Sequence, residues 1–176
     1  DSIPTPPDFN RHVLTETPIE TIWSYINPLM LYNRHLGMKG KDVKLLQRLK
    51  AEPKVRKEIN PKALQLWEQM EEVKLKYRNT ALMRPKAVFQ FFKAMSEGNS
   101  TFIFKKPTDS SAVTFEFPRQ SKKDGLCLSD YLRPKSHCSE DVFDNLCIFA
   151  TTVGKGLREQ ADYLKESGQY LESHFL

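Results

Sequence analysis

Three proline-containing steps constrain the fold of the first 61 residues more than any other feature of the sequence. They are Thr17-Pro18, Asn27-Pro28 and Asn60-Pro61. In each, a residue that favours helix N-caps precedes a proline, which suits the first helical position because the N–H group there has no intrahelical partner. Glu20, three residues after Thr17, completes the pattern of a capping box. We therefore predict a capped helix start at each step.

Apolar residues recur at helical spacing after each of these steps. Gly37 and Gly40 are expected to end the second helix, and Asp42 to cap a shorter helix that stops before Pro53. The last of these patterns, after Asn60-Pro61, is the strongest, and the helix that it predicts is expected to pack on a sheet. The predicted helices cover residues 18–26, 28–36, 43–50 and 61–77.

The middle of the chain has the patterns of β-strands. Residues 87–94 and 101–104 flank the turn residues 96–99, which predicts a β-hairpin. Apolar and polar residues then alternate over residues 113–117, as in a half-buried strand that ends at Pro118. The apolar run 146–153 has the length of a further strand.

Helical patterns return at the end of the chain. A helix is expected over residues 154–164, with an interruption at Gly168 and a restart at Tyr170. Helices, then a mainly antiparallel twisted sheet, then helices again predict an α+β fold. With 176 residues the chain can bury a sizeable core, so a single domain over residues 1–176 is expected. It lacks an initial Met and stops within a helical pattern, so we expect this domain to be truncated at its C-terminal end.

The net charge of +5 is concentrated in one segment. Residues 39–62, the basic segment, contain nine basic and three acidic side chains, whereas the rest of the chain carries a net charge of −1. Such a segment can attract an acidic protein, a nucleic acid or an anionic surface. Because no nucleic-acid recognition motif accompanies it, we do not favour nucleic acid as the partner.

The cysteines and the hydropathy indicate a reduced compartment and no membrane. Cys127, Cys138 and Cys147 cannot all pair, and their spacing fits neither a redox pair nor a zinc site. No apolar run is long enough to span a bilayer. We therefore expect a cytoplasmic protein.

The sequence contains no self-contained catalytic site. The histidines are scattered, so no metal site is predicted. His137-Cys138 lies in a polar loop without an orienting group, which favours a free thiol over a nucleophile. Gly154-Lys155-Gly156 follows a strand but has Glu159 where a dinucleotide site needs a third small residue. A tight strand-to-helix turn is the better interpretation.

Five segments in a fixed order resemble one known family. They are Arg84–Val88 leading into an aromatic strand, Ser96–Ser100, Phe117–Gln120, Cys127–Tyr131 and Asp144–Thr152. The chain, from about Tyr25 to Leu176, resembles the carboxy-terminal activation domain of cobalamin-dependent methionine synthase. The resemblance covers the amino-terminal and central part of that domain.

This resemblance implies S-adenosylmethionine as a cofactor and a cobalamin presented by another domain of the same enzyme. In the family, oxidised cob(II)alamin is reactivated by one electron from a flavodoxin-like protein and a methyl group from S-adenosylmethionine. The family's Arg-x-x-x-Gly-Tyr motif, which forms much of the ligand site, does not occur in this chain. The resemblance therefore implies part of a methyltransferase, and a site that this chain alone does not complete.

A few residues are expected to carry these roles. Asn27 aligns with a family aspartate that contacts the ligand, although an N-cap is the other interpretation of this residue. The family pattern implies retained roles for Arg119, Gln120 and Asp130, and we favour bracing of the loop between a strand and a helix over ligand contacts. The basic residues expected to bind an acidic flavodoxin-like electron donor are Lys54, Arg56 and Lys57.

Two other functions remain open. The chain can be a binding or scaffold module that keeps the fold without the ligand site. Less favoured is a nucleic-acid-binding domain that uses the basic segment.

Overall fold

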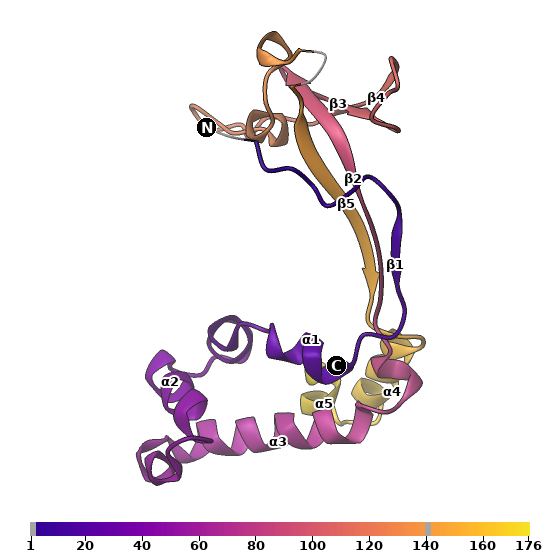
Figure 1. The fold of residues 1–176 in the computed structure, drawn as a ribbon. Helices are drawn as coiled ribbons and strands as arrows, with labels where there is room; N and C mark the ends of the chain where they lie inside the picture. The colour runs from indigo at the N-terminus through magenta and orange to yellow at the C-terminus, as the bar shows by residue number, and fades with distance from the viewer. Residues whose placement is uncertain (1–2, 140–141) are drawn as a thin grey trace. The chain divides into compact units, whose positions relative to one another are not determined.

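The structure is a computed structural model that describes residues 3–139 and 142–176. The chain divides into two compact units, each built from two stretches of sequence (Figure 1). The sheet unit combines Asp1–Leu14 with Ala87–Thr151, and the helical unit combines Thr15–Lys86 with Thr152–Leu176. The predicted α+β class is confirmed. The single domain over residues 1–176 stays a prediction.

The sheet unit is built around the long strand β2. Strands β1 and β3 pair with β2 in antiparallel register, β4 pairs with β3, and β5 pairs with β2. The predicted hairpin is confirmed, but its turn is shorter than expected because Glu97 and Ser100 still pair. Gly98, at φ +59°, lies in the turn, where glycine adopts a positive φ without strain. The strands are β1 (His12–Leu14), β2 (Lys86–Glu97), β3 (Ser100–Phe104), β4 (Ala112–Glu116) and β5 (Asp144–Thr152).

Two of the predicted strands are more exposed than their patterns suggest. The alternating residues of β4 were expected to be half-buried, yet Val113 and Phe115 are exposed. The apolar run of β5 is partly buried only at its start, and Phe149 near its end is 68% exposed. The reason is that an alternating or apolar pattern predicts a strand but not the layer that covers it.

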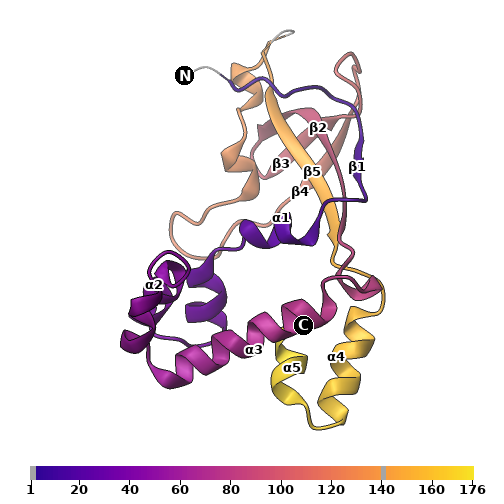
Figure 2. The same ribbon diagram turned by 60° about the horizontal axis from the view of Figure 1, so that its bottom comes forward.

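The helical unit contains five α-helices and three short helices of other types in its described residues. The short helix η1 is a π-helix, and η2 and η3 are 3₁₀-helices. Figure 2 shows α4 and α5 as two consecutive helices that fold back beside α3. The helices are α1 (Ile19–Ser24), η1 (Leu29–His35), α2 (Gly40–Arg48), η2 (Pro53–Glu58), α3 (Pro61–Tyr77), η3 (Ala81–Met83), α4 (Leu157–Glu166) and α5 (Tyr170–Phe175).

The helix starts predicted at the three proline steps are confirmed to within one residue, but two of the predicted caps are wrong. Asn60 Oδ1 accepts a hydrogen bond from the Lys62 N–H group at 3.0 Å, as a cap of α3. Thr17 makes no capping bond, because α1 begins one residue later with Pro18 at the N-cap position. Asp42 lies inside α2 rather than before it, and Gly40 begins that helix rather than ending the previous one. The proline and glycine signals locate these ends only to within a few residues.

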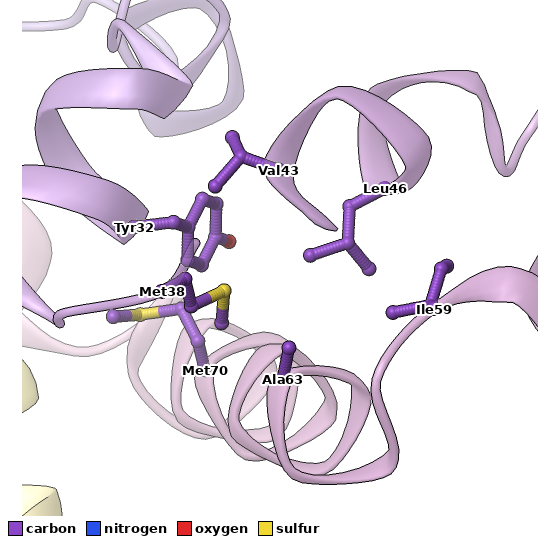
Figure 3. Close-up of a cluster of buried hydrophobic side chains, with 7 residues drawn as sticks. All are labelled: Tyr32, Met38, Val43, Leu46, Ile59, Ala63 and Met70. Atoms are coloured by element: carbon purple, nitrogen blue, oxygen red, sulfur yellow. The ribbon is translucent and has the colours of Figure 1, made fainter. Parts of the chain in front are cut away.

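The core of the helical unit is one apolar cluster (Figure 3). Ala63 and Met70 of α3 are buried against side chains of η1 and α2 and against Ile59, which precedes α3. The prediction that the helix 61–77 packs on a sheet stays a prediction. The buried Asp42 carboxylate joins the same region, because its Oδ1 accepts a hydrogen bond from the Asn60 N–H group at 3.0 Å. The cluster consists of Tyr32, Met38, Val43, Leu46, Ile59, Ala63 and Met70.

Candidate functional site

Asn27 lies at the junction between α1 and η1 and is exposed. Its Oδ1 atom accepts hydrogen bonds from the N–H groups of Leu29 at 3.0 Å and Met30 at 3.3 Å. These bonds satisfy two donors of the first helical turn, so the N-cap interpretation is confirmed. A carbonyl oxygen has two lone pairs, and both are engaged here. An ammonium group of a ligand would compete with these N–H groups, and the ligand role of Asn27 stays a prediction.

Arg119 and Asp130 form a two-pronged ion pair in the sheet unit. Arg119 Nη1 and Nη2 donate to the two carboxylate oxygens of Asp130 at 2.6 and 2.8 Å. The same guanidinium donates to the carbonyl oxygen of Gly125 at 3.0 Å. The contact with Arg119 is the main cause that lowers the pKa of Asp130 to about 2. The pair therefore joins the two ends of the loop 119–130, here called the braced loop.

A second set of contacts holds the C-terminal end of the braced loop. Asp130 Oδ2 accepts a hydrogen bond from the Cys127 N–H group at 2.8 Å, which caps the 3₁₀-helix η4 (Leu128–Tyr131). The buried Cys127 Sγ lies 2.9 Å from Ser129 Oγ and donates to the carbonyl oxygen of Phe117 at 3.2 Å. Asp130 thus serves both the ion pair and the helix cap.

The other expected member of this group, Gln120, contributes through its backbone. Its N–H group donates to the carbonyl oxygen of Leu126 at 3.0 Å, whereas its side chain is exposed. Gly125 was not singled out by the sequence analysis, although a Cβ atom there would lie only 2.0 Å from the Gln120 carbonyl oxygen. The dipeptide Asp124-Gly125 was the available signal, since this pair is typical of turns and Asp124 adopts φ +54°.

The bases expected to bind an acidic partner lie on η2, in the basic segment. Lys54, Arg56 and Lys57 are all exposed. Arg56 forms an ion pair with Glu68 of α3, which already offsets its charge. Among the described residues, no ion pair involves Lys54 or Lys57. The charge that remains available to a partner therefore comes from these two lysines more than from Arg56.

An open cleft of about 460 Å³ lies between α3 and α5 in the helical unit. Its lining includes Glu72 and Val73 of α3 and Phe175 of α5. Beside it, Glu172 Oε1 accepts hydrogen bonds from Lys76 Nζ and the Tyr77 hydroxyl, each at 2.6 Å. The Lys76 contact is the largest cause that lowers the pKa of Glu172, and burial is the largest cause that raises the pKa of Tyr77.

The glycine-rich segment after β5 is a tight turn. A Cβ atom at Gly154 would lie 2.1 Å from the Leu82 carbonyl oxygen, so only glycine fits at this approach of two backbones. Gly156 adopts φ +82° at the N-cap position of α4. The Lys155 N–H group donates to the Ala81 carbonyl oxygen at 3.2 Å. The turn interpretation is confirmed.

The described residues offer no candidate for a metal site, a disulfide or a membrane-spanning helix, and they disfavour a nucleophilic thiol at Cys138. Across residues 3–139 and 142–176, no group of three His, Cys, Asp or Glu side chains is placed to hold a metal ion. Cys127, Cys138 and Cys147 form no disulfide. Burial raises the pKa of the Cys138 thiol, which disfavours the nucleophilic thiolate. Within those same residues, no helix has both the length and the apolar character to cross a bilayer.

Comparison with known families decides among the functional interpretations. Residues 18–173 match the family model described as the activation domain of vitamin B12-dependent methionine synthase. The chain belongs to this family. The resemblance seen in the sequence is thereby confirmed, and the chain is an activation domain of the methionine synthase type.

Two further relatives agree with this assignment. A methionine synthase from Mycobacterium tuberculosis is 32% identical over 93 residues, which is 49% of this chain and 8% of the relative. A crystal structure of a MetH reactivation domain bound to AdoHcy superposes with a TM-score of 0.70 at 20% identity. It covers 99% of this chain, whereas this chain covers 52% of the solved one and so spans about half of that structure.

Proposed function

We propose that this chain contributes to the reactivation of a cobalamin-dependent methionine synthase by helping to present S-adenosylmethionine to the cobalamin of another domain. The family match over residues 18–173 is the observation that carries the proposal. The solved relative is described as bound to AdoHcy, the product that S-adenosylmethionine leaves when it has given up its methyl group. Neither the scaffold nor the nucleic-acid alternative is favoured by any specific observation.

The reaction requires that a methyl group be held in line with the cobalt. Cobalamin bound by another domain would supply the redox and methyl-accepting chemistry, taking one electron from a flavoprotein and the methyl group of S-adenosylmethionine, which would leave as S-adenosylhomocysteine. The cobalamin supplies the difficult chemistry, and the protein contributes position and orientation. The activation domain is therefore a positioning device in this proposal, and none of the residues of this chain is assigned a catalytic role.

The described residues fit S-adenosylmethionine only in part. Asn27 is the candidate ligand residue, and its amide oxygen already accepts two backbone hydrogen bonds. It carries no charge to balance the ligand's ammonium group. Because the chain spans 52% of the solved relative, we propose that further residues of a longer polypeptide complete the site.

Calorimetric titration with S-adenosylmethionine tests this proposal. We expect weak or no heat of binding for the 176-residue chain, and saturable binding for a polypeptide that spans the full length of the solved relative. In that longer form, Asn27→Asp should tighten binding by restoring a negative charge while keeping the capping oxygen. Asn60→Asp is a matched control, because Asn60 caps α3 in the same manner. Absence of binding by the longer form would remove the proposed function.

The electron donor is a separate part of the proposal. We propose that Lys54 and Lys57, with a smaller contribution from Arg56, attract an acidic flavodoxin-like protein. Charge pairs of this kind act mainly on the rate of association, and salt screens them. The double variant Lys54→Gln/Lys57→Gln should slow association with a flavodoxin at low salt. The double variant Lys105→Gln/Lys106→Gln removes the same charge from the sheet unit and should have no effect; equal slowing by both would contradict the assignment.

The expected neighbouring domain and cellular location follow from the same assignment. A cobalamin-binding domain of the same enzyme is the expected neighbour. We propose a cytoplasmic location, in keeping with the three cysteines that form no disulfide.

A further inference from the structure

The sheet unit contains a cleft of about 480 Å³, and none of its lining residues has a role in the proposed function. One wall is the N-terminal segment, which contributes Ile3, Pro6 and Phe9. The opposite wall comes from β2, from the loop that precedes β5 and from β5 itself. Clefts of this volume are large enough for a small organic ligand. The remaining lining residues are Thr5, Lys93, Arg133, Val142, Phe143 and Asn145.

The N-terminal wall is held in place at two points. Asn145 Nδ2 donates to the Pro4 carbonyl oxygen at 3.0 Å, and Gln90 Nε2 donates to the Phe9 carbonyl oxygen at 2.9 Å. Between these points the segment contains Pro6 and Pro7, whose rings restrict the backbone. Side-chain amides of β5 and β2 therefore fix both ends of a stiff strip of chain. The cleft is a built feature of the sheet unit.

The cleft presents two cationic side chains. Lys93 Nζ lies 5.2 Å from the centre of the Phe143 ring, and the same ring packs edge-to-face on Phe104 at 5.1 Å. The Arg133 backbone is tied to both neighbouring strands, because its N–H group donates to Asp144 at 2.9 Å and its carbonyl oxygen accepts from Ser96 at 3.0 Å. Lys93 and Arg133 are both half-buried.

No carboxylate among the described lining residues offsets these charges. Asp144 adjoins the lining residues Phe143 and Asn145 in the chain, and its two oxygens accept the N–H groups of Arg133 and Asn145 at 2.9 and 2.8 Å. The Arg133 side chain donates only to the His137 carbonyl oxygen in the described structure, which leaves further N–H donors. A guanidinium with unused donors and an ammonium group on the same cleft favour an anion, which both can bind through charge-assisted hydrogen bonds.

We propose that this cleft binds a small organic anion, a carboxylate or phosphate group attached to a flat apolar body. Lys93 and Arg133 bind the anionic group, and Asn145 and Thr5 offer further polar atoms. Phe9, Phe143 and Val142 contact the apolar body. The proposal does not depend on S-adenosylmethionine or cobalamin.

A titration of the 176-residue chain followed by two-dimensional amide NMR tests the proposal. Phenyl phosphate and phenylacetate are the probes, and their two anionic groups distinguish phosphate from carboxylate ligands. At least one probe should shift the backbone amides around Lys93, Arg133 and Asn145 in a saturable manner. No saturable shift with either probe would overturn the proposal.

Two simpler probes separate the two parts of the ligand. Inorganic phosphate should bind about tenfold more weakly than phenyl phosphate if the apolar walls contribute. Phenylacetamide, which is neutral, should bind about tenfold more weakly than phenylacetate if the cations contribute. Equal affinity for inorganic phosphate and phenyl phosphate would contradict the contribution of the apolar walls, and equal affinity for phenylacetamide and phenylacetate would contradict that of the cations. Either result would overturn the proposal.

Variants assign the binding to the named residues. Lys93→Gln and Arg133→Gln should each weaken the better probe about tenfold. The same spectra report whether each variant stays folded, and Arg133→Gln keeps the backbone hydrogen bonds that hold the loop. Lys106→Gln removes one exposed charge from the connection between β3 and β4 and should leave affinity unchanged. An unchanged affinity in both cleft variants would overturn the assignment.

Discussion

The helical unit and the sheet unit are each stabilised internally by a different kind of interaction. The helical unit buries a contiguous apolar cluster that includes Val43, fully buried, and Leu46. In the sheet unit, polar side chains are prominent among the buried residues, including Ser96, Thr101 and Ser129. The braced loop of this unit is held by hydrogen bonds and by the Arg119–Asp130 pair. Similar chain lengths therefore reach a folded state by apolar burial in one unit and by specific polar contacts in the other.

This difference changes how each unit should respond to mutation. Apolar burial is non-directional and tolerates small adjustments, whereas a buried polar network loses most of its value when one member is removed. Thr101 Oγ1 already lacks a partner among the described residues. We therefore expect cavity-forming changes to dominate in the helical unit, and changes of loop geometry or charge to dominate in the sheet unit.

The largest expected effect is the loss of a cluster side chain. Leu46→Ala should lower the free energy of unfolding of the helical unit by about 3 kcal/mol, because it removes buried contacts and leaves a cavity. Both tryptophans, Trp23 and Trp67, lie in this unit, so urea denaturation followed by tryptophan fluorescence reports on it selectively. Leu75→Ala in α3, where Leu75 is 64% exposed, is the control and should cost well under 1 kcal/mol.

The second effect concerns the geometry of the braced loop. Gly125→Ala places a Cβ atom 2.0 Å from the Gln120 carbonyl oxygen, so the loop must shift at a cost of about 2 kcal/mol. Cys127 should then react faster with iodoacetamide, measured at that residue by peptide mass spectrometry. Tryptophan fluorescence should not change. Gly40→Ala, where no atom lies within 4 Å of the new Cβ, should leave the Cys127 rate unaltered.

The third effect is a pH dependence of the sheet unit. The folded-state pKa of Asp130, about 2, lies below its ordinary value of 3.8. The folded state therefore binds this proton less readily, and the stabilisation is complete above the ordinary pKa and is lost as the pH falls towards 2. Arg119→Gln should move the pKa of Asp130 back towards 3.8 in an NMR titration of its carboxyl carbon. Lys122→Gln should leave it low; a low pKa in both variants would show that Arg119 is not the cause.

The smallest effect is expected at the surface of the helical unit. Arg56 and Glu68 are paired, but their side chains are 51% and 41% exposed. Exposed pairs of this kind contribute about 0.5 kcal/mol. Arg56→Gln should therefore barely change the urea midpoint seen by tryptophan fluorescence, and 1 M salt should remove the difference. A loss as large as that of Leu46→Ala would break the contrast between the cluster and the surface.

Much of the secondary structure followed from local signals. Asn60-Pro61 located the start of α3, and the hairpin of β2 and β3 was expected from its turn residues. Proline, glycine and capping residues act through their own backbone geometry, so their effects are visible without tertiary contacts. The same local signals also caused errors. Asp42 has a side chain typical of a cap but lies inside α2, where its carboxylate accepts a hydrogen bond from the Asn60 N–H group, eighteen residues away.

Part of the candidate site could be anticipated in the same way. Arg119, Gln120 and Asp130 were named because of the family pattern, and the cap formed by Asn27 followed from its place before a proline. The cleft with Lys93 and Arg133 was not anticipated, because its residues come from four separate stretches of chain. No sequence pattern indicates that Ile3 and Asn145 line the same cleft.

The sequence by itself determined which segments form helices and strands, with ends located to within a few residues, the position of the basic segment and, through ordered motifs, the family. The tertiary structure decided what each element packs against: α3 buries its apolar face among other helices, and β4 leaves Val113 and Phe115 exposed. The physical reason is that periodicity records which side of an element is apolar, whereas burial depends on the distant segments that reach that side. Ion pairs such as Arg56 with Glu68 follow the same rule, since they depend on which segments fold side by side.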